Sequence, residues 1–458
     1  MNLRRPRPFA RTLLALTLFS LWIGEAGAAQ LYSIETLIDQ GDPAPGSAGG
    51  VFMEPFGYDN WLDSYDVGAP GQFVFVASLA GGNAASAQYQ IVDSVISPIR
   101  FSGTPAPGGG TFDSFTQISA SPNGSIAFVG TVAGVDGVFL STVAQGDQRL
   151  WTIGDIAPGT GGQTFTSFAF PAVNDLGEVA FHATYSGGSG IFLRTGAGTT
   201  AIALTSQPSP SGFDYAGFNF NYVQINGAGT VVFTAQDLFG DEMVVRVHDG
   251  SAQAIALAGM ALPQGSGSIR APIRFAFLSE AGKIGYAVST GSCSDSVSVP
   301  AGSWSIPYPC VALEWENGMT RIVAQKGQPS AQVGGVVGRV VLAYPNDAGI
   351  TVLAQRDDGS SPNGIDEIFV EIGGELSTVA RSEDLPGMDP GLTPSFGFPI
   401  DSIGTIIFQA ETLLLLARPV PPPVPALSRT NGTWLALALM TLGSLLYRAE
   451  ATAAYRKD

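Results

Sequence analysis

Residues 174–183 read Asn-Asp-Leu-Gly-Glu-Val-Ala-Phe-His-Ala, and this stretch decides the fold because related versions of it recur along the chain. Its first four residues form a turn signal in which glycine supplies a positive φ, and an extended apolar segment follows. The intervals between the repeated glycines are 53, 53, 52, 53, 67 and 55 residues, so one unit of about 53 residues is repeated. The glycines of the seven copies are Gly71, Gly124, Gly177, Gly229, Gly282, Gly349 and Gly404.

A single unit contains four short strand signals separated by glycine-rich turns. In the third copy these signals fall at 168–173, 178–185, 191–195 and 200–204. Four antiparallel strands per repeat are typical of a β-propeller blade, whereas a β-solenoid has repeats of roughly 20–30 residues. Since no 3.6-residue period runs through the body, we expect few helices. The sequence therefore predicts an all-β, seven-bladed β-propeller of four-stranded antiparallel blades over residues 30–418.

The way in which the ring closes also follows from the repeats. After the seventh second strand only 413–417 remains as a strand, so the last blade lacks its outer member. Residues 33–38 have the same character and precede the first repeat. We therefore predict that the N-terminal strand completes the last blade, which removes the exposed edges of an open sheet.

Both ends of the chain read as targeting segments. Residues 1–29 have four arginines, an apolar stretch and the small residues of a cleavage site, as in a secretory signal peptide. A proline-rich spacer covers 419–427 and stiffens the chain. Residues 428–458 contain a short apolar run with basic residues near the end. One interpretation of this segment is a C-terminal membrane anchor formed by a transmembrane helix. The other is a sorting signal that is later cut.

Two resemblances support export. The motif Val424-Pro425-Ala426-Leu427-Ser428 resembles the tails of bacterial PEP-CTERM-like and IPTL-CTERM proteins, which exosortase-type enzymes process. The body has Gly-Asp-Pro-Ala-Pro-Gly at 41–46 and related motifs at 103–108 and 154–159. Together with the repeat, these motifs resemble the bacterial choice-of-anchor tandem-repeat (NxxGxxAFxA) proteins. The resemblance implies a surface or secreted propeller in the cell envelope or matrix and brings no biochemical activity with it.

Composition excludes several classes of partner and cofactor. The formal net charge of −17 argues against nucleic acid as a partner. Two histidines and two cysteines are too few for histidine-rich or cysteine-rich metal centres or iron–sulfur clusters. The chain is 45% apolar and only 13% charged, which is enough apolar material for a large core.

One loop offers the oxygen ligands that calcium prefers. It has five carboxylate or amide side chains within eleven residues, although their spacing is not that of an EF-hand. An acidic solvated turn is the alternative, and no cofactor other than calcium is implied. The five residues are Asp357, Asp358, Asn363, Asp366 and Glu367.

The two cysteines bracket an insertion in the fifth repeat. In an exported chain an even pair such as Cys293 and Cys310 usually forms a disulfide. Closing a loop of this length would stabilise it by about 3 kcal/mol.

We expect the binding face to be the one with the longest loops, which join the second and third strands at 79–88, 289–309 and 356–366. The first hypothesis is a non-enzymatic surface protein that binds a glycan or another protein. The alternatives are a polysaccharide hydrolase or lyase that uses carboxylates, and a purely structural surface-layer or biofilm component. The expected partners are the export machinery, a sorting enzyme, and the membrane before processing.

Overall fold

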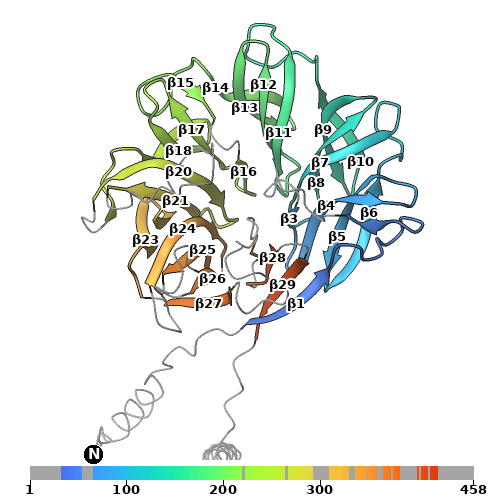
Figure 1. Cartoon of the computed structure of the whole chain (residues 1–458). Helices are drawn as coiled ribbons and strands as arrows, with labels where there is room; N and C mark the ends of the chain where they lie inside the picture. The colour runs from blue at the N-terminus through green and yellow to red at the C-terminus, as the bar shows by residue number, and fades with distance from the viewer. Residues whose placement is uncertain are drawn as a thin grey trace, which may run out of the picture. The chain divides into compact units, whose positions relative to one another are not determined.

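A computed structural model shows the body of the chain as a ring of β-sheets around a central axis (Figure 1). One compact unit spans Tyr32–Pro419. The predicted signal peptide and the C-terminal segment lie outside the described residues. The structure describes residues 32–53, 65–218, 222–263, 267–291, 309–329, 336–347, 349–357, 365–372, 375–381, 400–401, 404–410 and 413–420.

The first three sheets contain strands that are consecutive in the sequence, and each strand pairs antiparallel with its neighbours. The first contains β2 (Val51–Phe52), β3 (Tyr65–Val67), β4 (Gln72–Ala80), β5 (Ser86–Val92) and β6 (Val95–Phe101). The second contains β7 (Phe112–Ala120), β8 (Ile126–Val132), β9 (Val135–Thr142) and β10 (Gly146–Thr152). The third contains β11 (Phe165–Val173), β12 (Val179–Tyr185), β13 (Gly188–Thr195) and β14 (Gly198–Leu204).

The next three sheets have the same arrangement. The fourth contains β15 (Tyr215–Gly217), β16 (Val223–Ile225), β17 (Val231–Asp237), β18 (Glu242–His248) and β19 (Ser251–Leu257). The fifth contains β20 (Ile269–Leu278), β21 (Ile284–Thr290), β22 (Val311–Glu316) and β23 (Met319–Gln325). The sixth contains β24 (Val336–Pro345), β25 (Ile350–Asp357), β26 (Ile365–Ile372) and β27 (Glu375–Arg381).

The N-terminal strand closes the ring, as the repeats predict. A last, three-stranded sheet has the order β1 (Tyr32–Ile38), β29 (Leu413–Pro419) and β28 (Ile406–Ala410). β1 pairs antiparallel with β29 and not with any strand of the first sheet. The all-β propeller with antiparallel blades and an N-terminal closing strand is therefore confirmed. The count of seven complete blades is not confirmed. Six sheets have four or more described strands, whereas the sheet of β1, β29 and β28 has three.

Hydrophobic packing joins each sheet to the next. Among the described residues, six clusters of buried side chains each combine two successive sheets, and one of these joins the last sheet to the first. A seventh cluster combines the fifth, sixth and last sheets. The aromatic residue of the repeat lies in these interfaces and is fully buried, so it belongs to the core between blades. Its described copies are Phe75, Phe128, Phe181, Phe233, Tyr286 and Phe408.

Two expectations about loops and helices can be compared with this fold. The first long loop is shorter than predicted, because β4 runs to Ala80 and β5 begins at Ser86. Residues 79–80 and 86–88 belong to the two strands, where Leu79 and Ala87 are buried in the core, so the loop itself is 81–85. In the described part of the chain there is no α-helix, and no helix there is long and apolar enough to cross a membrane.

The closing strand provides a matched pair of positions for a stability test. Ile38 is 1% exposed and packs with the last and first sheets, whereas Ile34 in the same strand is 38% exposed. We expect Ile38→Ala to lower the free energy of unfolding by about 2–4 kcal/mol and Ile34→Ala by under about 1 kcal/mol. Urea denaturation measures both, and equal effects would contradict the role of β1 in closure.

Candidate functional site

Five inner turns of the propeller close with the same hydrogen bond, from the turn glycine N–H to the carbonyl of the first turn residue. These turns begin at Ser121, Asn174, Asn226, Ser279 and Asp401. In the six sheets with four or more described strands, each turn joins the innermost strand to the second strand, and the turn that begins at Asp401 leads into β28. In the third sheet, the Gly177 N–H donates to the Asn174 carbonyl at 3.0 Å, and Gly177 has φ +71°. The Asn174 Oδ1 accepts the backbone N–H of Leu176 and of Glu178 at 3.1 and 3.0 Å. The turns begin at Gly68, Ser121, Asn174, Asn226, Ser279, Asn346 and Asp401.

Asparagine side chains link consecutive turns. While its oxygen caps its own turn, the Asn174 Nδ2 donates to the Asn226 carbonyl in the next turn at 3.0 Å. The Asn226 Nδ2 donates to the Ser279 carbonyl at 3.4 Å, and the Asn346 Nδ2 donates to the Asp401 carbonyl. One amide group therefore satisfies buried backbone groups in two neighbouring blades.

The remaining links complete the circle. The Asn123 Nδ2 donates to the Asp175 carbonyl at 2.6 Å, and the Ala281 N–H donates to Asp347 Oδ1 at 3.1 Å. The Gly71 N–H of the first turn donates to Asp401 Oδ2 of the last turn at 2.8 Å. Next to the first two turns, the Ala120 N–H donates to Asp66 Oδ2 at 3.1 Å. We call this closed set of contacts the turn ring.

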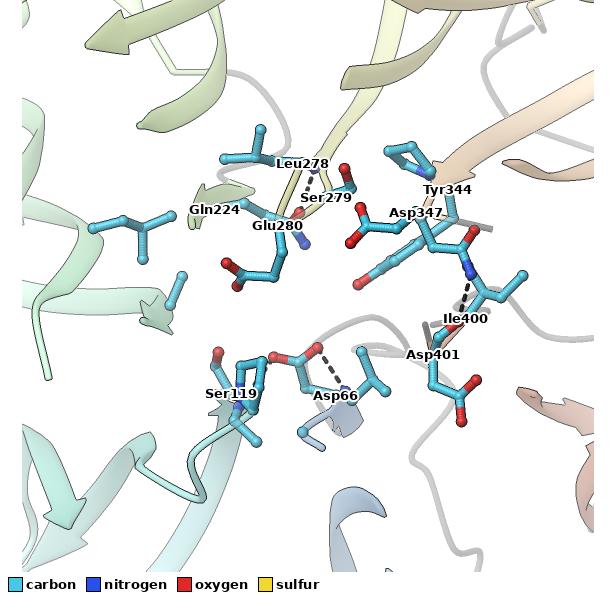
Figure 2. Close-up of a pocket in the computed structure, with 18 of the residues that line it drawn as sticks. Asp66, Ser119, Gln224, Leu278, Ser279, Glu280, Tyr344, Asp347, Ile400 and Asp401 are labelled. Atoms are coloured by element: carbon cyan, nitrogen blue, oxygen red, sulfur yellow. Dashed lines mark hydrogen bonds between the residues drawn. The ribbon is translucent and has the colours of Figure 1, made fainter. Parts of the chain in front are cut away.

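A cavity of about 150 Å³ lies inside the turn ring, lined by the inner turns and the ends of the inner strands. The side chains of Asp66, Glu280, Asp347 and Tyr344 point toward the same open space (Figure 2). Asp401 is the fourth carboxylate in the lining, and the described lining contains no lysine, arginine or histidine. We call this space the central cavity. It is smaller than the roughly 300–1,000 Å³ of pockets for drug-sized ligands, so it suits one small group.

Burial raises the pKa of two of these carboxyl groups. Burial raises the pKa of Asp66 to about 6, although hydrogen bonds from Ser119, Val67 and Ala120 oppose the shift. The pKa of Glu280 is also raised, first by burial and then by the nearby negative charge of Asp175 and Asp347. Uncompensated carboxylates in a partly desolvated space favour either a proton or a cationic ligand.

Tyr344 adds a polar group to the aromatic part of the wall. Burial, and then the charge of Asp66, raises the pKa of the Tyr344 phenol above its ordinary range. The Tyr344 hydroxyl hydrogen-bonds the Gln224 side chain, whose Oε1 accepts the Leu278 N–H at 2.6 Å. Its ring packs against Phe277 at 4.5 Å between centroids. The phenol is therefore a neutral donor or acceptor at physiological pH.

Each of the four carboxylates also accepts a backbone N–H. Beside the bonds to Asp66, Asp347 and Asp401 described above, the Glu280 Oε2 accepts the Gly227 N–H at 2.8 Å. These contacts fix the carboxylates on the wall of the central cavity. In the described residues no group of three histidine, cysteine or acidic side chains is placed to hold a metal ion.

The central cavity lies on the face opposite to the one that the long loops favour. Successive connections of an antiparallel meander alternate between the two faces of a propeller. The inner turns join first to second strands, whereas the predicted long loops join second to third strands. Two of those loops, 289–309 and 356–366, lie mainly outside the described residues, so binding on that face stays a prediction.

The predicted calcium ligands are only partly placed. Asp358 and Asn363 lie outside the described residues, while Asp357 ends β25. Asp366 is in β26 opposite Gln355. Glu367 is fully buried and forms an ion pair with Arg381 at 3.3 Å. The calcium site as a whole stays a prediction.

The predicted disulfide is also placed at one end only. Cys310 is buried at the start of the third strand of the fifth sheet, with its sulfur 3.6 Å from the Thr290 hydroxyl. Cys293 lies outside the described residues, so the bridge stays a prediction.

Sequence reasoning missed the residues of the central cavity. Asp66, Gln224 and Tyr344 each lie two residues before the start of an inner turn, and Glu280 and Asp347 each lie one residue after it. Aligning the repeats by their turn glycines would have placed these residues on one rim. That comparison, and not any local motif, was the available signal.

Comparison with known proteins gives a family. A family model described as a family of unknown function (DUF7453) matches residues 19–138 and 135–249. No curated protein matches the sequence. Among solved structures, a streptogramin B lyase is similar at 11% identity and a TM-score of 0.43, over 85% of this chain and 98% of that one. An oligogalacturonate lyase in complex with manganese is similar at 11% identity and a TM-score of 0.44, over 86% and 98%.

Two buried groups give stability effects of opposite sign with pH. The folded pKa of Asp66 is raised from 3.8 to about 6, so its stabilisation is complete below pH 4 and is lost as the pH rises to 6. Burial lowers the pKa of His182 from 6.5 to about 4, so its stabilisation is complete above pH 6.5 and is lost as the pH falls. Each effect is about 3 kcal/mol.

Urea denaturation between pH 4 and 7 measures how Asp66 and His182 each change the free energy of unfolding with pH. Relative to the wild type, Asp66→Asn should gain stability as the pH rises, and His182→Gln should gain it as the pH falls. Parallel profiles for all three proteins would show that neither group titrates as its burial requires.

Proposed function

Since this chain belongs to the DUF7453 family of unknown function, we propose its role from its own geometry: an exported, non-enzymatic β-propeller of the cell surface or matrix that binds another protein. The central cavity carries this proposal. Four carboxylates from different blades share one wall with no basic residue in the described lining. A lysine or arginine side chain of a partner protein has the charge, the size and the donors that match this wall.

The rigidity of the site supports binding. The turn ring fixes the carboxylates before any ligand arrives, so little ordering of the site would be required on association. Because the protein carries a net charge of −17, its field would also attract a basic partner at low ionic strength.

Titration calorimetry tests the proposal with a short lysine peptide whose N-terminal amine is acetylated and whose lysine side chains stay charged. The double variant Glu280→Gln/Asp347→Asn keeps the oxygens that accept the backbone N–H groups but removes two charges from the cavity. We expect it to weaken binding about tenfold. The control Asp249→Asn/Asp93→Asn removes two charges in outer-strand turns and should leave binding within about twofold.

Equal losses in the two double variants would mean that the peptide responds only to net charge. No binding by the wild type at low salt would remove the cavity as a protein-binding site.

A carboxylate-dependent polysaccharide hydrolase or lyase is the second candidate. The observation that favours it is the raised pKa of Asp66 in a cavity, which is a property of general acids. However, Asp66 accepts the Val67 and Ala120 N–H groups, which fits a structural role better. An enzyme would release new chain ends from polysaccharides, and Asp66→Asn would abolish that release.

We also propose that the sheet of β1, β29 and β28 is the seventh blade. The support is the turn that begins at Asp401, which takes the seventh place in the turn ring and contacts both neighbouring turns.

Export and sorting remain part of the proposal. Their support is the basic and apolar N-terminus and the motif at 424–428. Mass spectrometry of the mature protein should find residues 1–29 absent, and absence of 430–458 would identify the tail as a cut sorting signal. An intact N-terminus on surface-located protein would contradict the signal peptide.

A further inference from the structure

Three large apolar side chains are exposed together on the fourth sheet. Phe213 is 49% exposed, Leu238 63% and Phe239 72%. The two phenylalanine rings lie 4.5 Å apart between centroids at an interplanar angle of 66°. Phe213 precedes the first strand of the sheet and Phe239 lies between the second and third strands, so both are on the face opposite to the central cavity. We call these three residues the aromatic platform.

The repeats show that the fold does not require the aromatic platform. The Phe213 carbonyl accepts the Ser209 N–H at 2.8 Å, and the same turn contact recurs in four other repeats. Three of the equivalent residues are glycine and one is glutamine, and those repeats make the same closing hydrogen bond. The equivalent residues are Gly50, Gly110, Gln163 and Gly267.

A buried carboxylate holds the aromatic platform rigid. Asp237 is 1% exposed, and its Oδ1 accepts the backbone N–H of Phe239 and of Asp241 at 2.9 and 3.1 Å. Its Oδ2 accepts the Ser211 hydroxyl at 2.8 Å, which connects the two loops that carry the phenylalanines. The exposed rings are therefore presented in one arrangement, so a ligand would lose little free energy in ordering them.

We propose that the aromatic platform binds a neutral glycan. A sugar ring has an apolar C–H face that packs on an aromatic ring, and a rim of hydroxyl donors. Asp214 and Asp241 flank the two phenylalanines and are half-buried and exposed, respectively, so their carboxylates are accessible acceptors for hydroxyl groups.

Charge and area favour a neutral glycan over other ligands. A specific protein partner needs roughly 800 Å² of contact on each side, which is more than three side chains supply. The net charge of −17 repels anionic polysaccharides. This proposal does not depend on the central cavity, which lies on the other face.

Titration calorimetry of the mature exported protein tests the binding of a neutral glycan. The neutral probes are cellohexaose, chitohexaose and xylohexaose, and the anionic probe is hexagalacturonate. The double variant Phe213→Gln/Phe239→Ser replaces both rings with small polar residues, the first being the residue of the neighbouring repeat. We expect the wild type to bind at least one neutral probe and the double variant to bind it at least about tenfold more weakly. Its thermal melting temperature should stay within about 2 °C of the wild type.

Glu280→Gln/Asp347→Asn serves as the matched control in the central cavity and should leave glycan binding unchanged. Three results would overturn the proposal: no binding of any neutral probe by the wild type, equal binding by the phenylalanine double variant, or tighter binding of hexagalacturonate. The proposal would also be overturned if the wild type bound a protein partner but no glycan, and the phenylalanine double variant lost that partner.

Discussion

Hydrogen bonding from each inner turn to the next is the constraint on which the rest of the structure depends. Hydrophobic packing between sheets is strong but non-directional, so it does not by itself fix how far one sheet slides along its neighbour. The Asn174 amide caps its own turn and donates to the Asn226 carbonyl, so it fixes that register. Since the links return from Asp401 to Gly71, the seven turns hold each other in one circle.

The central cavity and the aromatic platform both follow from that circle. The turns bring Asp66, Glu280 and Asp347 together although they come from three different blades. On the opposite face, the loops are free of this constraint, because the sheets are already registered at the turns. One repeat can therefore replace a small residue by Phe213 without changing the turn around it. A rigid rim and a variable loop face are the two surfaces that such a ring offers to partners.

The repeats predicted most of the fold and little of the site. The glycine spacing predicted the sheets and closure through β1, because these depend on patterns that recur locally. The count of seven complete blades went beyond the described strands. The carboxylates of the central cavity were missed because each comes from a different repeat, so no local motif contains two of them. Loop length favoured the face opposite to the central cavity, where binding stays a prediction.

Hydrogen–deuterium exchange of the native protein tests the closed ring most directly. If β1 and β29 are one cooperative unit, peptides over 32–38 and 413–419 should exchange together, with the slow rates of the other sheets. Fast exchange of 32–38 beside slow exchange of 413–419 would show that the N-terminal strand does not close the ring, and would contradict the account.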